Sequence, residues 1–70
     1  MHYKNINSIK QLRKLKKVTQ KELSLYIGIS ERNYRAKENG CIQFTSYEMI
    51  RLKKYFKLNY EDFYNVFFSN

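Results

Sequence analysis

The chain has no proline or tryptophan, and only two glycines, one cysteine and one histidine among its 70 residues. Proline and glycine most often interrupt helices, so their scarcity favours an almost entirely helical chain. The single cysteine, Cys41, excludes an intramolecular disulfide and a thiolate metal cluster, and we interpret it as a reduced loop residue. The lone histidine, His2, has no second ligand nearby, so we predict no metal and no cofactor.

Long apolar segments are also missing. No run approaches the roughly 18 apolar residues of a membrane span, and no apolar core of a signal peptide is found. We therefore expect a cytoplasmic protein with no membrane contact. A chain of this size is predicted to form a single domain over residues 1–70, with its core at about 8–68 and no room for an enzyme cleft. No arrangement of nucleophile, base and acid is recognisable, so we predict a non-enzyme with no small-molecule ligand.

Acidic residues are few: six Asp and Glu stand against 14 Lys and Arg, which gives a net charge of +8. Residues 1–40 hold ten basic and three acidic residues, whereas residues 41–70 hold four and three. A positive half of this kind attracts a polyanion such as double-stranded DNA. The alternative is a solvated basic face without a specific partner, because net charge alone concerns solubility and non-specific binding.

Residues 19–40 carry start and stop signals for two short helices. Thr19 and Glu22 form a capping box, which starts a helix one residue after Thr19. Gly28 can adopt the positive φ that ends this helix. Ser30 is a strong N-cap for the next helix, and an Asn-Gly pair closes the segment. Two short helices with a glycine at the joint form a helix-turn-helix.

Three further helices are expected around this motif. A cap at residue 7 or 8 starts a helix to about Lys17, and Thr45 with Glu48 forms a capping box for a helix to about Lys57. Asn59 caps the last helix. The apolar residues expected on their inner faces are Ile9, Leu12, Leu15, Val18, Met49, Leu52, Phe56, Phe63 and Phe67. The predicted fold class is all-α, with five helices.

Short elements in a fixed order resemble the DNA-binding domain of the lambda-repressor and Cro type, also called the xenobiotic-response-element family. They are Thr19-Gln20, Glu22-Leu23, Gly28-Ile29-Ser30 and Glu38-Asn39-Gly40, and the similarity extends from about Ile9 to Tyr64. The resemblance implies a compact five-helix domain in which helices 2 and 3 form the motif. It also implies a phage repressor-like or Cro-like transcription regulator that binds an inverted-repeat operator as a homodimer.

The resemblance places four residues of the second motif helix at groove-facing sites: Glu31, Arg32, Arg35 and Ala36. Arginine can donate two bonds to guanine, glutamate can accept from cytosine, and the alanine methyl can touch thymine, so a G·C-containing half-site is predicted. The alternative for each arginine is a phosphate contact or a solvated side chain. Glu31 could instead repel phosphate or favour the positive helix N-terminus. Tyr34, which lies between these residues, is expected to pack inward.

The same resemblance implies contacts to the DNA backbone and one structural ion pair. The predicted phosphate-binding residues are Gln20, Lys21, Lys37 and Asn39. Gln20 stands at a helix N-terminus, where free N–H groups already attract an anion, although it could be only a first-turn surface residue. Arg13 and Glu38 match a family ion pair that ties the first helix to the end of the reading helix.

Three features depart from the family pattern. Lys37 stands where a large apolar residue is usual, so its stem is expected to lie along the core or the helix to pack less firmly. Lys57 stands where glycine commonly ends the fourth helix, so we expect Asn59 or water to complete that end. The C-terminal segment is rich in rings, and we expect Tyr64 and Phe68 to form the dimer interface. Alternatively, these rings fold onto the fourth helix and close the core of a monomer.

Two other functions remain open. The first is a protein-interaction module on the same fold, such as an antitoxin, an antirepressor or an inhibitor of a host protein. Such a module has no reason to keep Gln20, Arg32 and Asn39 at groove-facing sites. The second is charge-driven binding to any nucleic acid, which would not distinguish one duplex from another.

Overall fold

The computed structural model describes residues 6–68, so His2 lies outside the described residues. Within this range there are five helices and no strand, and the expected all-α fold class is confirmed. The helices are α1 (Ile9–Leu15), α2 (Gln20–Ile27), α3 (Glu31–Glu38), α4 (Ser46–Phe56) and α5 (Tyr60–Phe67). None of these described helices has the length and apolar character needed to cross a membrane.

Side-chain caps determine where each helix begins. Every N-cap side chain accepts a hydrogen bond from the backbone N–H three residues later, and the caps are Ser8, Thr19, Ser30, Thr45 and Asn59. At α2 and α4 the third helical residue is a glutamate that accepts the N–H of the cap in return. These bonds satisfy donors that the first helical turn leaves without partners, so the starting points follow from local sequence.

A residue with positive φ follows each of the first four helices: Lys17 (58°), Gly28 (82°), Gly40 (85°) and Lys57 (55°). Gly28 ends α2 with φ 82°, as the sequence predicts. The expectation that Asn59 completes the end of α4 is wrong, because Lys57 itself adopts the left-handed conformation there, with φ 55°. The next residue, Leu58, then donates its N–H to the Lys53 carbonyl at 3.0 Å. Asn59 serves only as the cap of α5.

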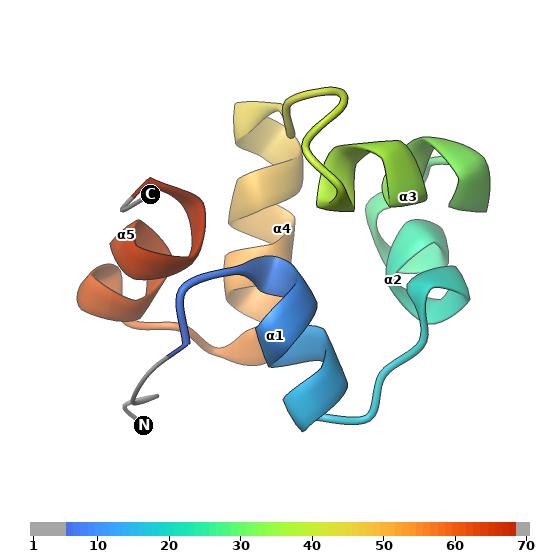
Figure 1. The fold of residues 1–70 in the computed structure, drawn as a ribbon. Coiled ribbons are helices and arrows are strands. Elements are labelled where there is room, and N and C mark those ends of the chain that lie inside the picture. The colour runs from blue at the N-terminus through green and yellow to red at the C-terminus, as the bar shows by residue number, and fades with distance from the viewer. Residues whose placement is uncertain (1–5, 69–70) are drawn as a thin grey trace.

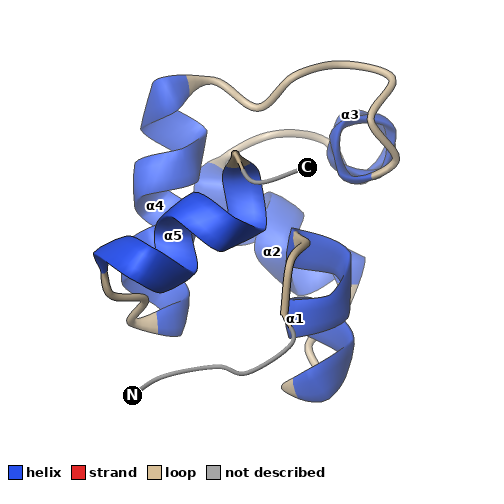
Figure 2. Cartoon of the chain, turned by 60° about the vertical axis from the view of Figure 1, so that its left-hand side comes forward, coloured by secondary structure: helices blue, strands red, loops and turns tan. Residues whose placement is uncertain are grey.

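The helices are arranged around α4. Figure 1 shows α2 and α3 on one side of α4 and α5 on the other, with α1 between the two groups. In the rotated view of Figure 2, α3 and α5 again lie apart from each other. α2 packs against both α3 and α4. The helix-turn-helix and the aromatic C-terminal helix therefore occupy separate parts of the surface.

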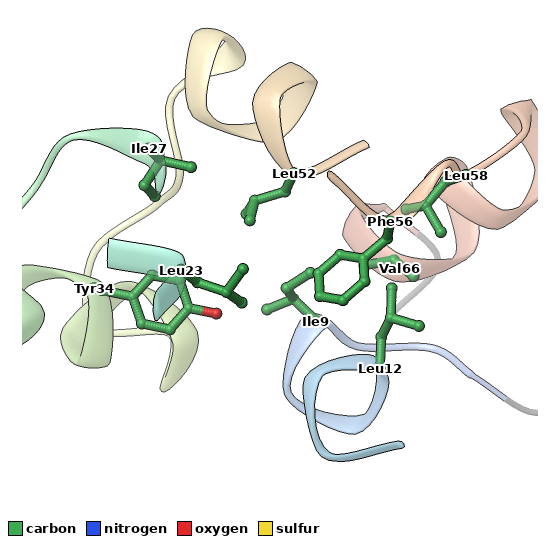
Figure 3. Packing of buried hydrophobic residues seen from close by; sticks show 9 residues of the cluster. All are labelled: Ile9, Leu12, Leu23, Ile27, Tyr34, Leu52, Phe56, Leu58 and Val66. Atoms are coloured by element: carbon green, nitrogen blue, oxygen red, sulfur yellow. The ribbon is translucent and has the colours of Figure 1, made fainter. Parts of the chain in front are cut away.

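The core contains residues from all five helices and from the α4–α5 connection (Figure 3). Its buried members are Ile9, Leu12, Leu23, Ile27, Tyr34, Leu52, Phe56, Leu58 and Val66. The prediction that Leu15 is buried is wrong, because its side chain is 57% exposed. At about 3.6 residues per turn, Leu15 lies about a third of a turn away from Ile9 around the helix axis, beyond the inner face.

Candidate nucleic-acid interface

The two faces of α3 differ in chemistry. Tyr34 is completely buried, and Figure 3 shows its ring among the core side chains. Arg32 and Arg35 are exposed, and Ala36, one turn after Arg32 on the same face, is partly buried. Glu31, at the start of the helix, is also exposed. The inward position of Tyr34 is as expected, and it turns the polar face of the helix toward solvent.

Glu38 at the end of α3 is the centre of a polar network. Its carboxylate accepts from Arg13 at two points, Nε to Oε2 at 2.8 Å and Nη2 to Oε1 at 3.0 Å. The Tyr34 hydroxyl donates to Oε2 at 2.7 Å, and Gln20 Nε2 donates to Oε1 at 2.9 Å. The expected partners Arg13 and Glu38 thus lie in direct contact, and Glu38 joins α1, α2 and α3.

The charge states within this network follow from the contacts. Burial by itself would raise the pKa of Glu38, but hydrogen bonds from Arg13, Tyr34 and Gln20 outweigh burial and hold the pKa below its usual value. The hydrogen bond to Glu38 raises the pKa of Arg13. Burial, followed by the bond to Glu38, raises the pKa of Tyr34 far above its ordinary value. At neutral pH the network therefore holds a carboxylate, a guanidinium and a neutral phenol.

Arg13 has a further contact that fixes the chain before α2. Its Nη1 donates to the carbonyl of Val18 at 3.1 Å. The guanidinium side chain is only 12% exposed and the Glu38 side chain is fully covered. Charge-assisted, two-point pairs of this kind are the strong hydrogen bonds of proteins. The ion pair therefore places the N-terminus of α2 relative to α3.

Gln20, predicted to bind phosphate, is held by protein atoms on both sides of its amide. Besides donating to Glu38, its Oε1 accepts from Arg35 Nε at 3.3 Å. Arg35 also donates through Nη2 to Glu31 Oε2 at 3.3 Å, one turn earlier on α3. Two of the predicted base-reading residues are thus paired with each other, and one of them also touches a predicted clamp.

The structure corrects the expectation that Lys37 binds phosphate. Its ammonium donates to both carboxylate oxygens of Glu48, at 2.6 and 2.7 Å. The two side chains are only 11% and 8% exposed. The lysine charge is therefore neutralised next to the core, where it joins α3 to α4. The side chain is thus nearly covered, as expected for a lysine whose stem lies along the core.

The other predicted phosphate-binding residues remain at the surface. Asn39 is the exposed C-cap of α3, and Lys21 is exposed in the first turn of α2. The first turn of α2 has backbone N–H groups without intrahelical partners, which is a favourable setting for an anion. These positions and the outer face of α3 supply hydrogen-bond donors beside two exposed glutamates, Glu22 and Glu31.

Sequence reasoning missed two residues that shape this face. The Tyr34 hydroxyl reaches Glu38 four residues later on the same helix, a spacing at which side chains meet, so the pair could have been found. Glu48 was read only as part of a capping box. Its second role, binding Lys37, joins residues 11 apart in sequence and has no local signal. Among residues 6–68, no group of acidic, histidine or cysteine side chains is suited to hold a metal ion.

The chain was compared with protein families, curated proteins and solved structures. Searches of curated proteins and of solved structures found no significant similarity. A family model described as helix-turn-helix matches residues 9–63, which is most of the chain and includes α1 to α4 and the start of α5. This match, together with the capped α2–turn–α3 unit, shows that the chain belongs to the lambda-repressor and Cro-type family of helix-turn-helix DNA-binding domains.

Proposed function

We propose that this protein is a sequence-specific transcription regulator of the phage repressor and Cro kind, acting in the cytoplasm by binding and not by catalysis. The observation that carries the proposal is the division of α3, whose inner face is fixed by buried Tyr34 while Arg32 and Arg35 are exposed. An α-helix fits the major groove, where base pairs present distinguishable patterns. Occupying a site that polymerase needs is the simplest regulatory mechanism.

The proposed base contacts come from the outer face of α3. Arg32 and Arg35 each donate to the O6 and N7 atoms of guanine, and Ala36 touches a thymine methyl. Glu31 accepts from a cytosine amino group and also orients Arg35, with which it forms a pair at 3.3 Å. The preferred half-site therefore contains G·C pairs.

The proposed backbone contacts surround this helix. Asn39 binds a phosphate beyond the C-terminus of α3, and Lys21 adds attraction at the start of α2. Gln20 keeps one of its two amide hydrogens beyond the bond to Glu38, and this hydrogen donates to a phosphate beside the N-terminus of α2. These contacts fix the register of the domain on the duplex.

We further propose a homodimer on an inverted-repeat operator, formed through α5. Tyr64 and Phe68 are 58% and 52% exposed, and their rings lie 6.1 Å apart. Phe68 also borders a hollow of about 490 Å³ that extends from Phe44 and Val66 to the end of α3 at Lys37, Glu38 and Gly40, and this hollow can receive an apolar side chain from a second copy. α5 lies across α4 from α2 and α3 (Figure 1), and neither Arg32 nor Arg35 lines the hollow, so a two-fold contact there leaves the outer face of both reading helices uncovered.

Selection from a random duplex library tests the proposed function. We expect the parent protein to enrich a two-fold symmetric sequence with G·C pairs in each half-site. Fluorescence anisotropy should then give tighter binding to the enriched duplex than to a shuffled one, by about 10³-fold or more. Equal affinity for both duplexes at every salt concentration would instead indicate charge-driven binding to any nucleic acid.

Analytical ultracentrifugation tests the dimer separately. Phe68→Glu should shift the parent toward monomer, because it places a charge in the proposed apolar contact. Tyr47→Glu is the matched control, since Tyr47 is a 64% exposed ring on α4, outside the patch. A parent that stays monomeric at high concentration and binds the symmetric duplex without cooperativity would contradict the dimer.

A protein-interaction role is the second candidate, and one observation favours it. Leu25 and Ile50 are 71% and 59% exposed on α2 and α4, outside the proposed dimer patch. Large apolar side chains left at the surface can supply contact area for another protein. This function predicts no enrichment from the duplex library, together with unchanged DNA behaviour when Arg32 and Asn39 are replaced.

A further inference from the structure

The amide of Gln20 has a defined orientation. Its Nε2 donates to Glu38 at 2.9 Å and its Oε1 accepts from Arg35 Nε at 3.3 Å. The reversed amide would place an oxygen against the carboxylate and an N–H group against the guanidinium, so it loses both bonds. The partners on the two sides therefore allow one orientation.

The inner end of this chain of bonds is anchored in the protein. The Glu38 side chain is fully covered, and two bonds from Arg13 and one from Tyr34 hold its carboxylate. A carboxylate fixed by three donor bonds cannot rotate without breaking them. Gln20 thus links this fixed carboxylate to the outer face of the reading helix α3.

The outer end of this series of hydrogen bonds is Arg35, whose side chain would otherwise be mobile. Arg35 is 52% exposed, and long exposed arginines have considerable rotamer freedom. Here Gln20 on α2 holds Nε, and Glu31 on α3 holds Nη2 at 3.3 Å. Of the five guanidinium N–H donors, these bonds use two and leave the others for a base edge.

We propose that Gln20 is a positioning residue for Arg35: it transmits the fixed orientation of Glu38 to the reading arginine and so sharpens the choice of the base pair that Arg35 contacts. This inference rests on the proposed base reading by Arg35. It adds a second role to Gln20. A phosphate contact alone would contribute equally to the affinity for every DNA sequence. Holding the guanidinium before binding reduces the entropy lost when the complex forms.

The first test needs no DNA. In NMR spectra of the free protein, the Nε–Hε group of Arg35 should have a high order parameter, and Gln20→Met should lower it, because methionine has similar length and no amide. Asn39→Ala, which changes the other proposed clamp, should leave it unchanged. Backbone amide spectra report folding, and Gln20→Ala replaces Gln20→Met if the latter does not fold. An Arg35 Nε–Hε group equally mobile in parent and variant would overturn the proposal.

The second test measures base choice. Gln20→Met should lower the discrimination at the base pair read by Arg35 by about two- to tenfold, and should have no such effect in an Arg35→Ala background. Asn39→Ala should weaken binding to all duplexes alike. If Gln20→Met also weakens all duplexes alike with its sequence preference intact, Gln20 is a phosphate contact only and the proposal is wrong. A parent that selects no sequence would overturn the proposed function itself, while the NMR result still decides whether Gln20 holds Arg35.

Discussion

The residues around the helix-turn-helix and those of the C-terminal part are held together by different forces. In the motif region, residues 13–40, charged and polar groups converge on Glu38 from three helices. In the ring region, residues 44–68, aromatic pairs such as Phe44–Phe67 and Phe63–Phe67 lie at 5.9 and 5.2 Å between ring centroids. Hydrogen bonds have strict geometry, whereas ring packing tolerates small shifts. The motif region can therefore aim side chains, and the ring region can seal the core.

Contacts between α2 or α3 and α4 join the two regions. Lys37 on α3 pairs with Glu48 on α4. Arg51 on α4 donates to the Tyr26 carbonyl, one of the last four of α2, at 2.7 Å, and its guanidinium lies 4.4 Å from the centre of the Tyr26 ring. The hydrogen-bonded motif region thus packs against a ring region that tolerates small shifts. The following changes test this contrast.

Replacing Glu38 should produce the largest effect. Glu38→Gln leaves the buried Arg13 guanidinium without a charged partner and should lower the free energy of unfolding by about 3–5 kcal/mol. This loss approaches the whole stability of a domain of this size. Urea unfolding followed by circular dichroism measures it. Glu31→Gln, in an exposed pair, is the control and should change stability by less than about 0.5 kcal/mol; equal losses would refute the special role of Glu38.

The network around Glu38 also predicts that the stability of the folded protein depends on pH in the acid range. Because the pKa of Glu38 is lower in the folded protein than in the unfolded chain, its contribution is complete above the unfolded value of about 4.3. It is lost as the pH falls through the folded pKa. The parent should therefore lose more stability between pH 6 and pH 3 than Glu38→Gln does, although Glu48, whose pKa is also lowered, contributes in both. Identical pH profiles would contradict this origin of the acid sensitivity.

Cutting one link between the regions should have a smaller effect. Arg51→Met keeps an unbranched stem but removes the donor to the Tyr26 carbonyl, so we expect a loss of about 1–3 kcal/mol in unfolding free energy. Lys54→Met, at an exposed site on the same helix, should change it by no more than about 0.5 kcal/mol. If both variants are as stable as the parent, the contact does not support α2.

Within the ring region, a change of shape should be tolerated. Phe67→Leu replaces one ring by a branched apolar side chain and should lower unfolding stability by less than about 1.5 kcal/mol. Neighbouring rings, Phe44 and Phe63, can shift to fill the space. Thermal unfolding of this variant beside Glu38→Gln compares the regions directly. A Phe67→Leu loss larger than the Glu38→Gln loss would reverse the contrast drawn above.

One change should increase stability. Lys57 adopts φ 55°, a conformation that favours glycine over residues with a side chain. Lys57→Gly should raise the unfolding free energy by about 0.5–1 kcal/mol, seen as a higher midpoint of thermal unfolding. Lys54→Gly, in the last turn of α4, should lower it by up to about 1 kcal/mol. A destabilised Lys57→Gly protein would show that the lysine makes compensating contacts.

The helices could be predicted from sequence because their signals are local. The capping residues Thr19, Ser30, Thr45 and Asn59 each act on a backbone group three residues away, and the structure contains all of these bonds. The left-handed Lys57 was missed because nothing in a lysine signals that conformation. Helix starts are thus encoded by side chains, whereas a helix end can depend on the surrounding fold.

The candidate site was only partly predictable. A resemblance in sequence names positions such as Arg13 and Glu38, but it does not say that Gln20 bridges Glu38 and Arg35, because these residues come from two helices and meet only after folding. The pairing of Lys37 was missed for the same reason, because its partner Glu48 belongs to another helix. Exposure of the outer face of α3 did follow from sequence, because the buried Tyr34 fixes the rotation of the helix.

The central claim is that α3 reads base pairs, and Arg32 tests it most directly. Duplexes selected from a random library by the parent and by Arg32→Ala should differ at one base pair in each half-site, where the variant loses its preference. Its affinity for the parent's best duplex should fall by about 1–3 kcal/mol. If the variant selects the same sequences as the parent with unchanged preference at every position, Arg32 does not read a base, and the account of α3 as the reading helix is contradicted.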